Sequence, residues 1–123
     1  MKAIIEVAKR GSIFAAAAEQ IAASRRGKAP DYRLSFESAR SLFSELTPAR
    51  LDLMDTLRRI GPSSVNALAK AADRNYSNVH TDVARLEELG LVARSDDGGV
   101  SVPFESVEIL FPLAQVAYLP SEA

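Results

Sequence analysis

The chain of 123 residues contains no cysteine and no tryptophan, and only one histidine. The absence of cysteine excludes a disulfide framework, thiolate metal sites and a cysteine nucleophile, and it fits a reducing cytoplasm, which is the expected location. No apolar run approaches the roughly 20 residues that cross a bilayer. The alanine-rich stretch near the N-terminus is interrupted by Glu19 and Gln20. We therefore expect neither a signal peptide nor a membrane partner.

The chain also lacks an overall excess of charge, because its net charge is -1. The charges are nevertheless unevenly distributed. Residues 1–30 carry a net +4, residues 31–47 a net -1, residues 48–95 a net +1, and residues 96–123 a net -5. This polarity predicts a basic surface near the start and an acidic one near the end. A hydrophobic fraction of 47% is enough for a core, and the length suits one domain with an added arm.

A catalytic or metal-binding cluster is also missing from the pattern. His80 is the single histidine and has no pair of carboxylates beside it. Glu87 and Glu88 are adjacent on an expected helix, so they point in different directions and are expected to be solvated or paired with Arg85. Residues 96–99 read Asp-Asp-Gly-Gly, which indicates a tight turn more than a calcium loop. We predict no enzyme activity, no cofactor and no metal.

The first 46 residues predict alternating short elements followed by a helix. In order, these are a strand at 2–7, a helix at 12–26, a linker at 28–32, a strand at 33–36 and a helix at 37–46. In the last of these, Phe43 and Leu46 are expected to face inward. Residues 1–32 form a candidate dimerisation arm. Within it, Arg25, Arg26 and Lys28 suit either a phosphate-binding arm or a solvated helix end.

From Thr47 the helix signals are sharper. Thr47 followed by Pro48 is an N-cap with proline at the first helical position, and Gly61-Pro62 ends that helix after apolar residues that include Leu57 and Ile60. The elements that follow are a helix from Ser63 or Ser64 to about Asp73, a helix capped near Tyr76-Ser77 and closed by Gly90, strands at 91–95 and 100–103, and an apolar segment at 107–119 that begins as a strand.

The helix that ends at Gly90 has two different faces. Val79, Val83 and Leu86 fall within a narrow arc, whereas the opposite side carries arginine and short side chains that donate and accept hydrogen bonds. Such groups suit a major groove, where arginine reads guanine and asparagine reads adenine. The alternative is a plain solvated face. The residues expected to contact DNA are Ser64, Arg74, Asn75, Tyr76, Ser77, Asn78, Thr81, Arg85 and Arg94.

The stretch SSVNALAKAADRNYSNVHTDVARLEELGLVARSDDGGVSVPFE resembles the winged helix-turn-helix of MarR-like prokaryotic regulators. The preceding LSFESARSLFSELTPARLDLMDTLRRIGP is similar to a small subgroup of these proteins, often encoded beside a toxin-like gene. The resemblance implies an α+β fold at 33–111, in which a three-helix core carries a two-stranded wing, with residues 112–123 as a tail. It also implies a homodimer on a near-palindromic site in double-stranded DNA. Many relatives place a glycine where this chain has Ala72 and Asp73, a departure that bears on the turn.

The pattern and the resemblance together predict a sequence-specific transcriptional regulator, a repressor that acts on its own operator. Arg94, at the base of the wing, is expected to contact the DNA backbone, whereas Asp96 and Asp97 would be repelled by phosphate. One alternative is an antitoxin that neutralises a partner toxin through its N-terminal arm or its acidic, apolar C-terminal segment. That segment also suits burial in the core or in a dimer surface. Another alternative is a winged helix that contacts only protein.

Overall fold

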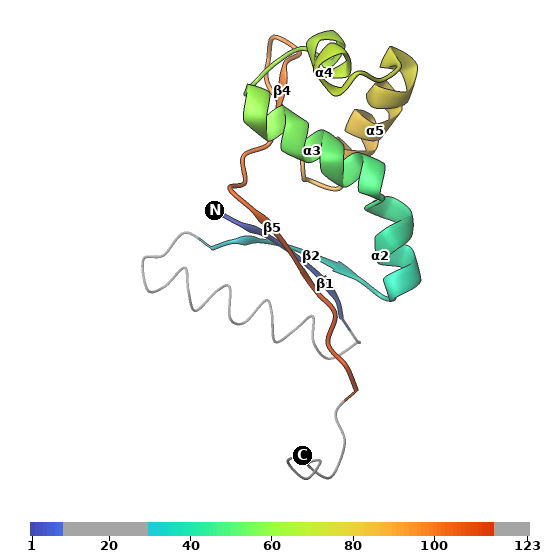
Figure 1. The fold of residues 1–123 in the computed structure, drawn as a ribbon. Helices are drawn as coiled ribbons and strands as arrows, with labels where there is room; N and C mark the ends of the chain where they lie inside the picture. The colour runs from blue at the N-terminus through green and yellow to red at the C-terminus, as the bar shows by residue number, and fades with distance from the viewer. Residues whose placement is uncertain (9–29, 115–123) are drawn as a thin grey trace.

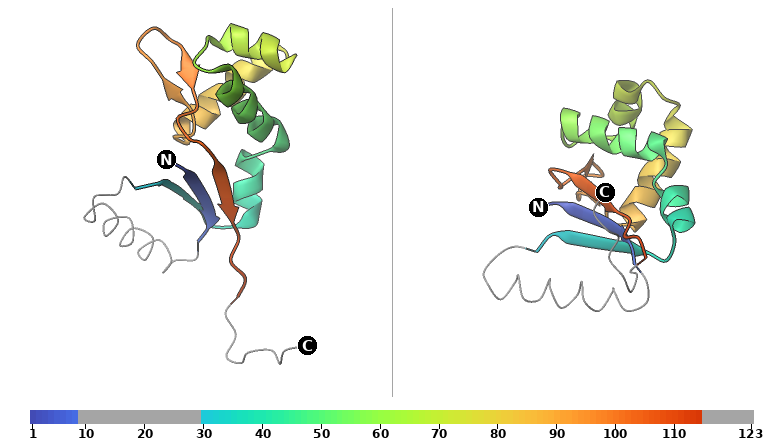
Figure 2. Two further views of the ribbon diagram at one scale, coloured as in Figure 1. Left: turned by 60° about the vertical axis from the view of Figure 1, so that its left-hand side comes forward. Right: turned by 60° about the horizontal axis from the view of Figure 1, so that its bottom comes forward.

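The computed structural model describes residues 1–8 and 30–114, and the expected helix at 12–26 with its basic end at 25–28 lies outside the described residues. The described part contains four helices and five short strands, which confirms the predicted α+β class. A helical layer lies beside a small sheet, and a hairpin at residues 93–101 projects from the helical layer (Figures 1 and 2). Among the described helices, none is long and apolar enough to span a membrane.

The larger sheet contains three parallel strands. Strand β1 (Ala3–Val7) lies in the centre, between β2 (Tyr32–Phe36) and β5 (Val107–Leu110). All three strands were expected, but their pairing was not. The expected arm at 1–32 therefore supplies the central strand of the sheet, which is hydrogen-bonded to residues 32–36 and 107–110. A strand's alternating pattern predicts that it will pair but does not identify its partner.

Four helices form the other layer: α2 (Ala39–Glu45), α3 (Pro48–Ile60), α4 (Val65–Ala72) and α5 (Tyr76–Glu88). Each begins after a polar side chain that accepts a hydrogen bond from a backbone N–H of the first turn. These N-cap residues are Ser38, Thr47, Ser64 and Asn75. The expected caps at Thr47 and Ser64 are confirmed, and α5 begins one residue earlier than expected.

A short antiparallel hairpin, formed by β3 (Ala93–Arg94) and β4 (Val100–Ser101), follows α5. Both strands are shorter than the sequence predicted. Ser63, which precedes α4, also pairs with Val100, through N–O distances of 3.0 Å and 2.8 Å. The chain between α3 and α4 therefore adds a third extended segment to the hairpin. This bridge fixes the hairpin against the helices.

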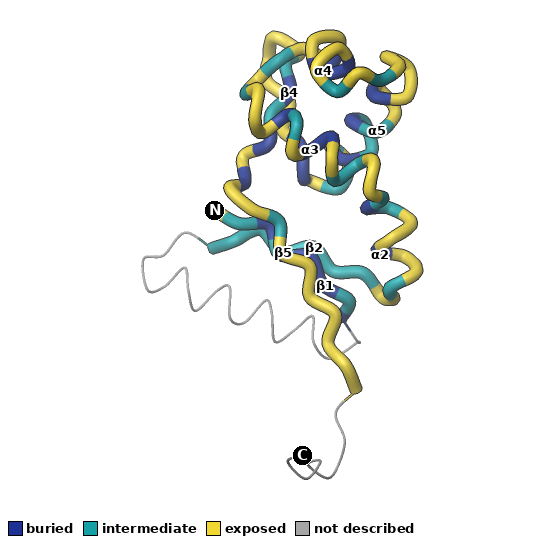
Figure 3. The backbone as a smooth tube through the Cα atoms, viewed as in Figure 1, coloured by how far each residue is buried: buried dark blue, intermediate teal, exposed yellow. Residues whose placement is uncertain are grey.

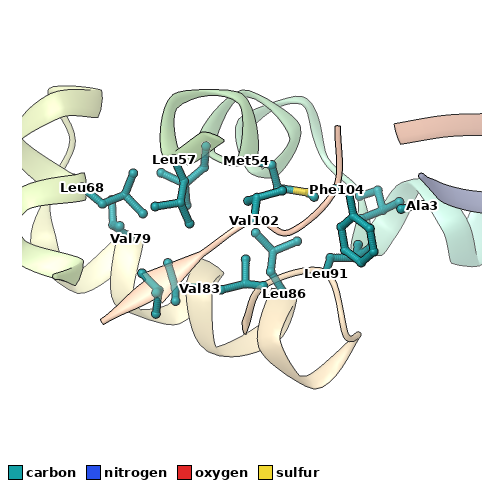
Figure 4. Packing of buried hydrophobic residues seen from close by; sticks show 14 of the residues in the cluster. Ala3, Met54, Leu57, Leu68, Val79, Val83, Leu86, Leu91, Val102 and Phe104 are labelled. Carbon is teal, nitrogen blue, oxygen red and sulfur yellow. The ribbon is translucent and has the colours of Figure 1, made fainter. Parts of the chain in front are cut away.

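One hydrophobic core joins the helices to the hairpin and to one face of the sheet (Figures 3 and 4). Its members on the helices include Leu57, Leu68 and Val79, and Ala3 and Ile5 join it from β1. The expectation that Phe43 faces inward is wrong, because its side chain is 53% exposed. Leu46, at the end of α2, is buried as expected, and Leu42, four residues before it, takes the inward position in place of Phe43. Ile60 is also exposed, at the last turn of α3.

Candidate nucleic-acid interface

The turn between α4 and α5 is tight, and an aspartate forms it. Asp73 adopts the left-handed conformation, with φ 53° and ψ 49°, and its N–H donates to the carbonyl of Lys70. The N–H of Arg74 donates to the carbonyl of Ala69. Aspartate tolerates this region better than most residues. The missing glycine therefore does not prevent a compact turn, and α5 begins three residues after Asp73.

The outer face of α5 begins at its first turn. Val79, Val83 and Leu86 are buried against α3 and α4, as the sequence predicted. The exposed residues of the first two turns are Tyr76, Ser77, Asn78, His80 and Thr81. The expected residues Tyr76, Ser77, Asn78 and Thr81 therefore lie together here, with His80 beside them. This is the part of α5 farthest from the sheet in Figure 1.

Several of these residues also have local structural partners. Asn75 caps α5 by accepting from the N–H of Asn78 at 3.3 Å, and the hydroxyl of Thr81 donates to the carbonyl of Ser77 at 3.1 Å. The rings of Tyr76 and His80 lie 5.9 Å apart. Within the described part of the chain, the side chains of Ser77 and Asn78 have no hydrogen-bond partner. Their polar groups are therefore available to an external ligand.

Arg74 is placed differently from the outer polar set. Its Nη2 donates to Oδ2 of Asp82 at 2.7 Å, and Oδ1 of the same carboxylate accepts from Nε of Arg50 at 3.0 Å. Burial raises the pKa of Asp82, but the hydrogen bonds from Arg74 and Arg50 outweigh burial and lower it overall. Arg74 therefore ties the start of α5 to α3 through a shared carboxylate.

Arg85, in the last turn of α5, is similarly engaged. It donates to both carboxylate oxygens of Glu45 at 2.7 Å and to Glu88 at 2.9 Å. The hydrogen bond from Arg85 lowers the pKa of Glu45, and the paired carboxylates raise the pKa of Arg85. Glu45 also accepts from Arg50 at 3.3 Å. The two expected DNA-reading arginines thus belong to one network that links α2, α3 and α5.

Arg94 lies at the base of the hairpin, where the sequence placed it. Its Nε donates to Glu87 at 3.0 Å and its Nη1 to the carbonyl of Gly98 at 3.0 Å. At the tip, Asp97 accepts from Ser95 and from the N–H of Gly99, and both bonds lower its pKa. Gly98 has φ 87°. The turn interpretation of residues 96–99 is therefore confirmed.

Ser64 and Lys70 complete the surface on the α4 side. Ser64 is exposed and caps α4 by accepting from the N–H of Ala67 at 3.0 Å. Lys70 is exposed in the last turn of α4, and within the described ranges no carboxylate pairs with it. Lys70 was not among the residues expected to contact DNA. Its position shortly before the polar residues that begin α5 is the feature of the sequence that could have identified it as a phosphate contact.

Of the carboxylates that engage the arginines, Glu88 was expected to be solvated or paired with Arg85, and it does pair with it, whereas Glu45 and Asp82 were not predicted. Glu45 lies 40 residues before Arg85, and Arg50 lies 32 residues before Asp82. No short-range spacing reveals such pairs, because they depend on how the helices pack. Among the described residues, no three His, Asp or Glu side chains gather as metal ligands would.

Comparison with known proteins gives one match. The family model described as HVO_A0114 matches residues 45–109, which is more than half of the chain. The matched region runs from the last residue of α2 into β5 and includes the whole α4–α5 unit and the hairpin. No curated protein and no solved structure matches. The family description states no activity.

Proposed function

The chain belongs to the HVO_A0114 family, and from the geometry of α4, α5 and the hairpin we propose that it is a sequence-specific DNA-binding transcriptional regulator. The observation that carries this proposal is the outer face of α5. Its first two turns expose polar side chains, while three apolar residues anchor the opposite face in the core. A helix fixed in this way fits a major groove, which is about 12 Å wide.

The proposed fold is a winged helix-turn-helix similar to that of MarR-like regulators. Three features support it: the order of α3, α4 and α5, the tight turn at Asp73, and the hairpin that follows α5. The bridge between Ser63 and Val100 ties the segment before α4 to the hairpin. In this arrangement α4 crosses the DNA backbone and α5 enters the groove.

The proposed base contacts come from the start of α5. The amide of Asn78 can donate to and accept from adenine, and the hydroxyl of Ser77 suits either a base edge or a phosphate. Tyr76 and Thr81 flank them. Lys70 and Ser64 lie at the two ends of α4 and suit phosphate contacts.

Arg74 and Arg85 were expected to contact DNA, but carboxylates of the protein already bind both side chains. DNA would have to compete with Asp82 for Arg74 and with Glu45 for Arg85, at bonds of 2.7 Å. We propose that these two side chains orient α5, which then presents Asn78. Arg94 pairs with Glu87 and stays near the surface, where it can reach a phosphate. The exposed acids at the hairpin tip stay clear of the backbone.

The proposed biological role is repression of an operator near the chain's own gene, by a homodimer on a near-palindromic site. The first 30 residues carry a net charge of +4, which suits attraction toward DNA. Binding at an operator blocks polymerase without any chemical step. This role is consistent with the expectation that the chain is not an enzyme.

Fluorescence anisotropy of the full chain with a labelled duplex from upstream of its own gene, against a scrambled duplex, tests the proposal. A salt series should show weaker binding as salt rises, because phosphate contacts release counterions. Replacement of Asn78 by alanine should weaken binding to the native duplex by about ten-fold or more. Ser77 on α5 and Ser41 on α2 are both exposed serines, so Ser41→Ala is the matched control for Ser77→Ala. Only Ser77→Ala should weaken binding to the native duplex. Equal binding to both duplexes would reject sequence-specific recognition.

An antitoxin role is a second candidate, and exposed apolar residues at the end of β5 and just after it favour this role. Ile109, Leu110, Phe111 and Leu113 are all at least 40% exposed, within a segment of net charge -5. Such a surface can cover a basic partner. Co-purification with the product of the neighbouring gene tests this role, and Leu113→Glu should then abolish the complex.

A further inference from the structure

Strand β5 forms an open edge of the three-stranded sheet. The strand order is β2-β1-β5, and in the described part of the chain β5 pairs only with β1. Figures 1 and 2 show β5 at the side of the sheet, with the chain continuing away from it toward Ala114. An open, apolar edge is a template for another strand, and proteins usually cover or charge such edges.

The outward backbone groups of this edge can be identified from one hydrogen bond. The N–H of Ala3 in β1 donates to the carbonyl of Ser106 at 3.0 Å. Alternate residues of a strand direct their N–H and C=O groups to opposite sides. Glu108 and Leu110 therefore face β1, whereas Val107, Ile109 and, by continuation, Phe111 face outward. Pro112 lacks an N–H, but its position faces inward, so the outward edge keeps all its donors.

Side chains along this edge are also uncovered. Ile109 is 40% exposed, Leu110 51%, Phe111 52% and Leu113 80%. Figure 3 shows β5 mostly exposed, beside the more buried β1. A contiguous apolar strip on a strand edge indicates an interaction surface. The question is which strand completes it.

We infer that the β5 edges of two copies of this chain pair in antiparallel fashion about a twofold axis at Ile109. Ile109 then lies opposite the partner's Ile109, and Val107 lies opposite the partner's Phe111. Every outward N–H and C=O between these residues finds a partner, and two three-stranded sheets become one of six strands. This inference does not depend on DNA binding.

The charges on the strand favour a second copy over a basic partner. In this register Glu108 lies opposite the partner's Leu110, so the two glutamates do not face each other. Each Glu108 already has a cation, because Nζ of Lys2 lies 3.5 Å from its carboxylate. The charge of Glu108 is therefore already paired, and the remaining exposed side chains of this edge are apolar, so an apolar partner strand fits it better than a basic one.

A hollow beside β5 favours the same occupant. It lies between α3 and residues 102–107, has a volume of about 270 Å³, and its apolar lining includes Leu51, Met54 and Phe104. Val107 also lines it. In the inferred register the partner's Phe111 lies directly beside Val107, and the partner's chain continues toward the hollow. The partner's exposed Phe111 and Leu113 would then cover it.

Cysteine cross-linking tests the register directly, because the chain contains no cysteine of its own. Opposed residues of a hydrogen-bonded antiparallel pair have Cα atoms about 5.5 Å apart, within disulfide range. Ile109→Cys should therefore form a covalent dimer under mild oxidation. Phe111→Cys should not, because the two copies of residue 111 lie about 14 Å apart along the strands. An equal mixture of Val107→Cys and Phe111→Cys chains should cross-link as the mixed dimer.

Sedimentation of the full chain across a concentration series provides the independent measurement. Wild type should show a monomer–dimer equilibrium, and Phe111→Glu should abolish the dimer. Phe43→Glu is the matched control, because Phe43 is equally exposed, at 53%, but lies on α2. Circular dichroism should show that both variants remain folded. A monomer at every concentration, or a dimer that survives Phe111→Glu, would overturn the inference, as would cross-linking of Phe111→Cys in preference to Ile109→Cys.

Discussion

Arg85 on α5 donates to both carboxylate oxygens of Glu45 on α2, through two bonds of 2.7 Å. This bidentate pair joins the outer flank of α5 to α2, although α3 and α4 lie between these two helices in the chain. A guanidinium engaged in this way is oriented by protein and not by solvent. The orientation of α5, and hence of the polar groups at its start, depends in part on Glu45.

The first prediction concerns the stability of this network. Glu45→Ala should lower the free energy of unfolding by about 1–2 kcal/mol, because two arginines lose a partly buried acceptor. Asp55→Ala is the control, since Asp55 pairs with Arg59 at the surface and its side chain is 82% exposed. Its removal should cost less than about 0.5 kcal/mol. Urea unfolding of both variants makes the comparison, and equal losses would mean that the network is not a structural tie.

The second prediction concerns acid pH. The pKa values of Glu45 and Asp82 are both lowered from their ordinary values of 4.5 and 3.8. Below these ordinary values, the unfolded chain binds more protons than the folded chain does. The free energy of unfolding should therefore fall as the pH drops from about 4.5 through the lowered pKa values of the folded state. Above pH 4.5 the contribution of Glu45 is fully present. Urea titrations at several pH values measure the slope, and Glu45→Gln should flatten it. An unchanged slope in that variant would exclude Glu45 as a source.

Local structure was largely predictable from the sequence, because it depends on neighbouring residues. The cap at Thr47, the buried face of α5 and the turn at 96–99 all follow from short-range patterns. The prediction for Phe43 was wrong. Helix α2 has only seven residues, too few to show a clear apolar face in the sequence, and it is Leu42 and Leu46 that face the core.

Long-range pairing was not predictable in the same way. Nothing near Ala3 indicates that β1 lies between β2 and β5, or that Asp82 binds two arginines. The outer face of α5 was assigned from helix angles alone. Those angles place Arg85 away from the core, but they do not show that α2 lies there with Glu45.

The third prediction concerns Gly90, which closes the turn after α5. It has φ 79°, and an added Cβ would contact Oη and Cζ of Tyr32 at less than the normal separation. The hydroxyl of Tyr32 donates to the carbonyl of Leu89 at 2.6 Å, so the ring cannot move without loss of that bond. Gly90→Ala should cost about 2–4 kcal/mol, from backbone strain and overpacking together. Gly98→Ala is the control, with φ 87° and open space around it, and it should cost clearly less in thermal or urea unfolding.

The fourth prediction concerns Asp73 in the turn before α5. Asp73→Gly should keep or raise stability, because glycine adopts a φ of 53° without steric cost. Asp73→Ala should lower stability by about 1 kcal/mol. Asp73→Asn separates charge from conformation, since asparagine tolerates the same region but is neutral. If alanine and asparagine gave equal midpoints of unfolding, conformation would not be the reason for aspartate here.

The last prediction separates orientation of α5 from contact with DNA. Arg74→Ala removes the 2.7 Å bond to Asp82 and should lower both stability and DNA affinity. Asn78→Ala removes an exposed side chain and should lower affinity alone. Arg74→Lys retains the charge but not the planar donor geometry that Asp82 uses, so it should resemble alanine. If lysine restored affinity while stability stayed low, Arg74 would act as a phosphate contact and not as a positioning residue. Anisotropy and urea unfolding on the same protein samples distinguish the two roles.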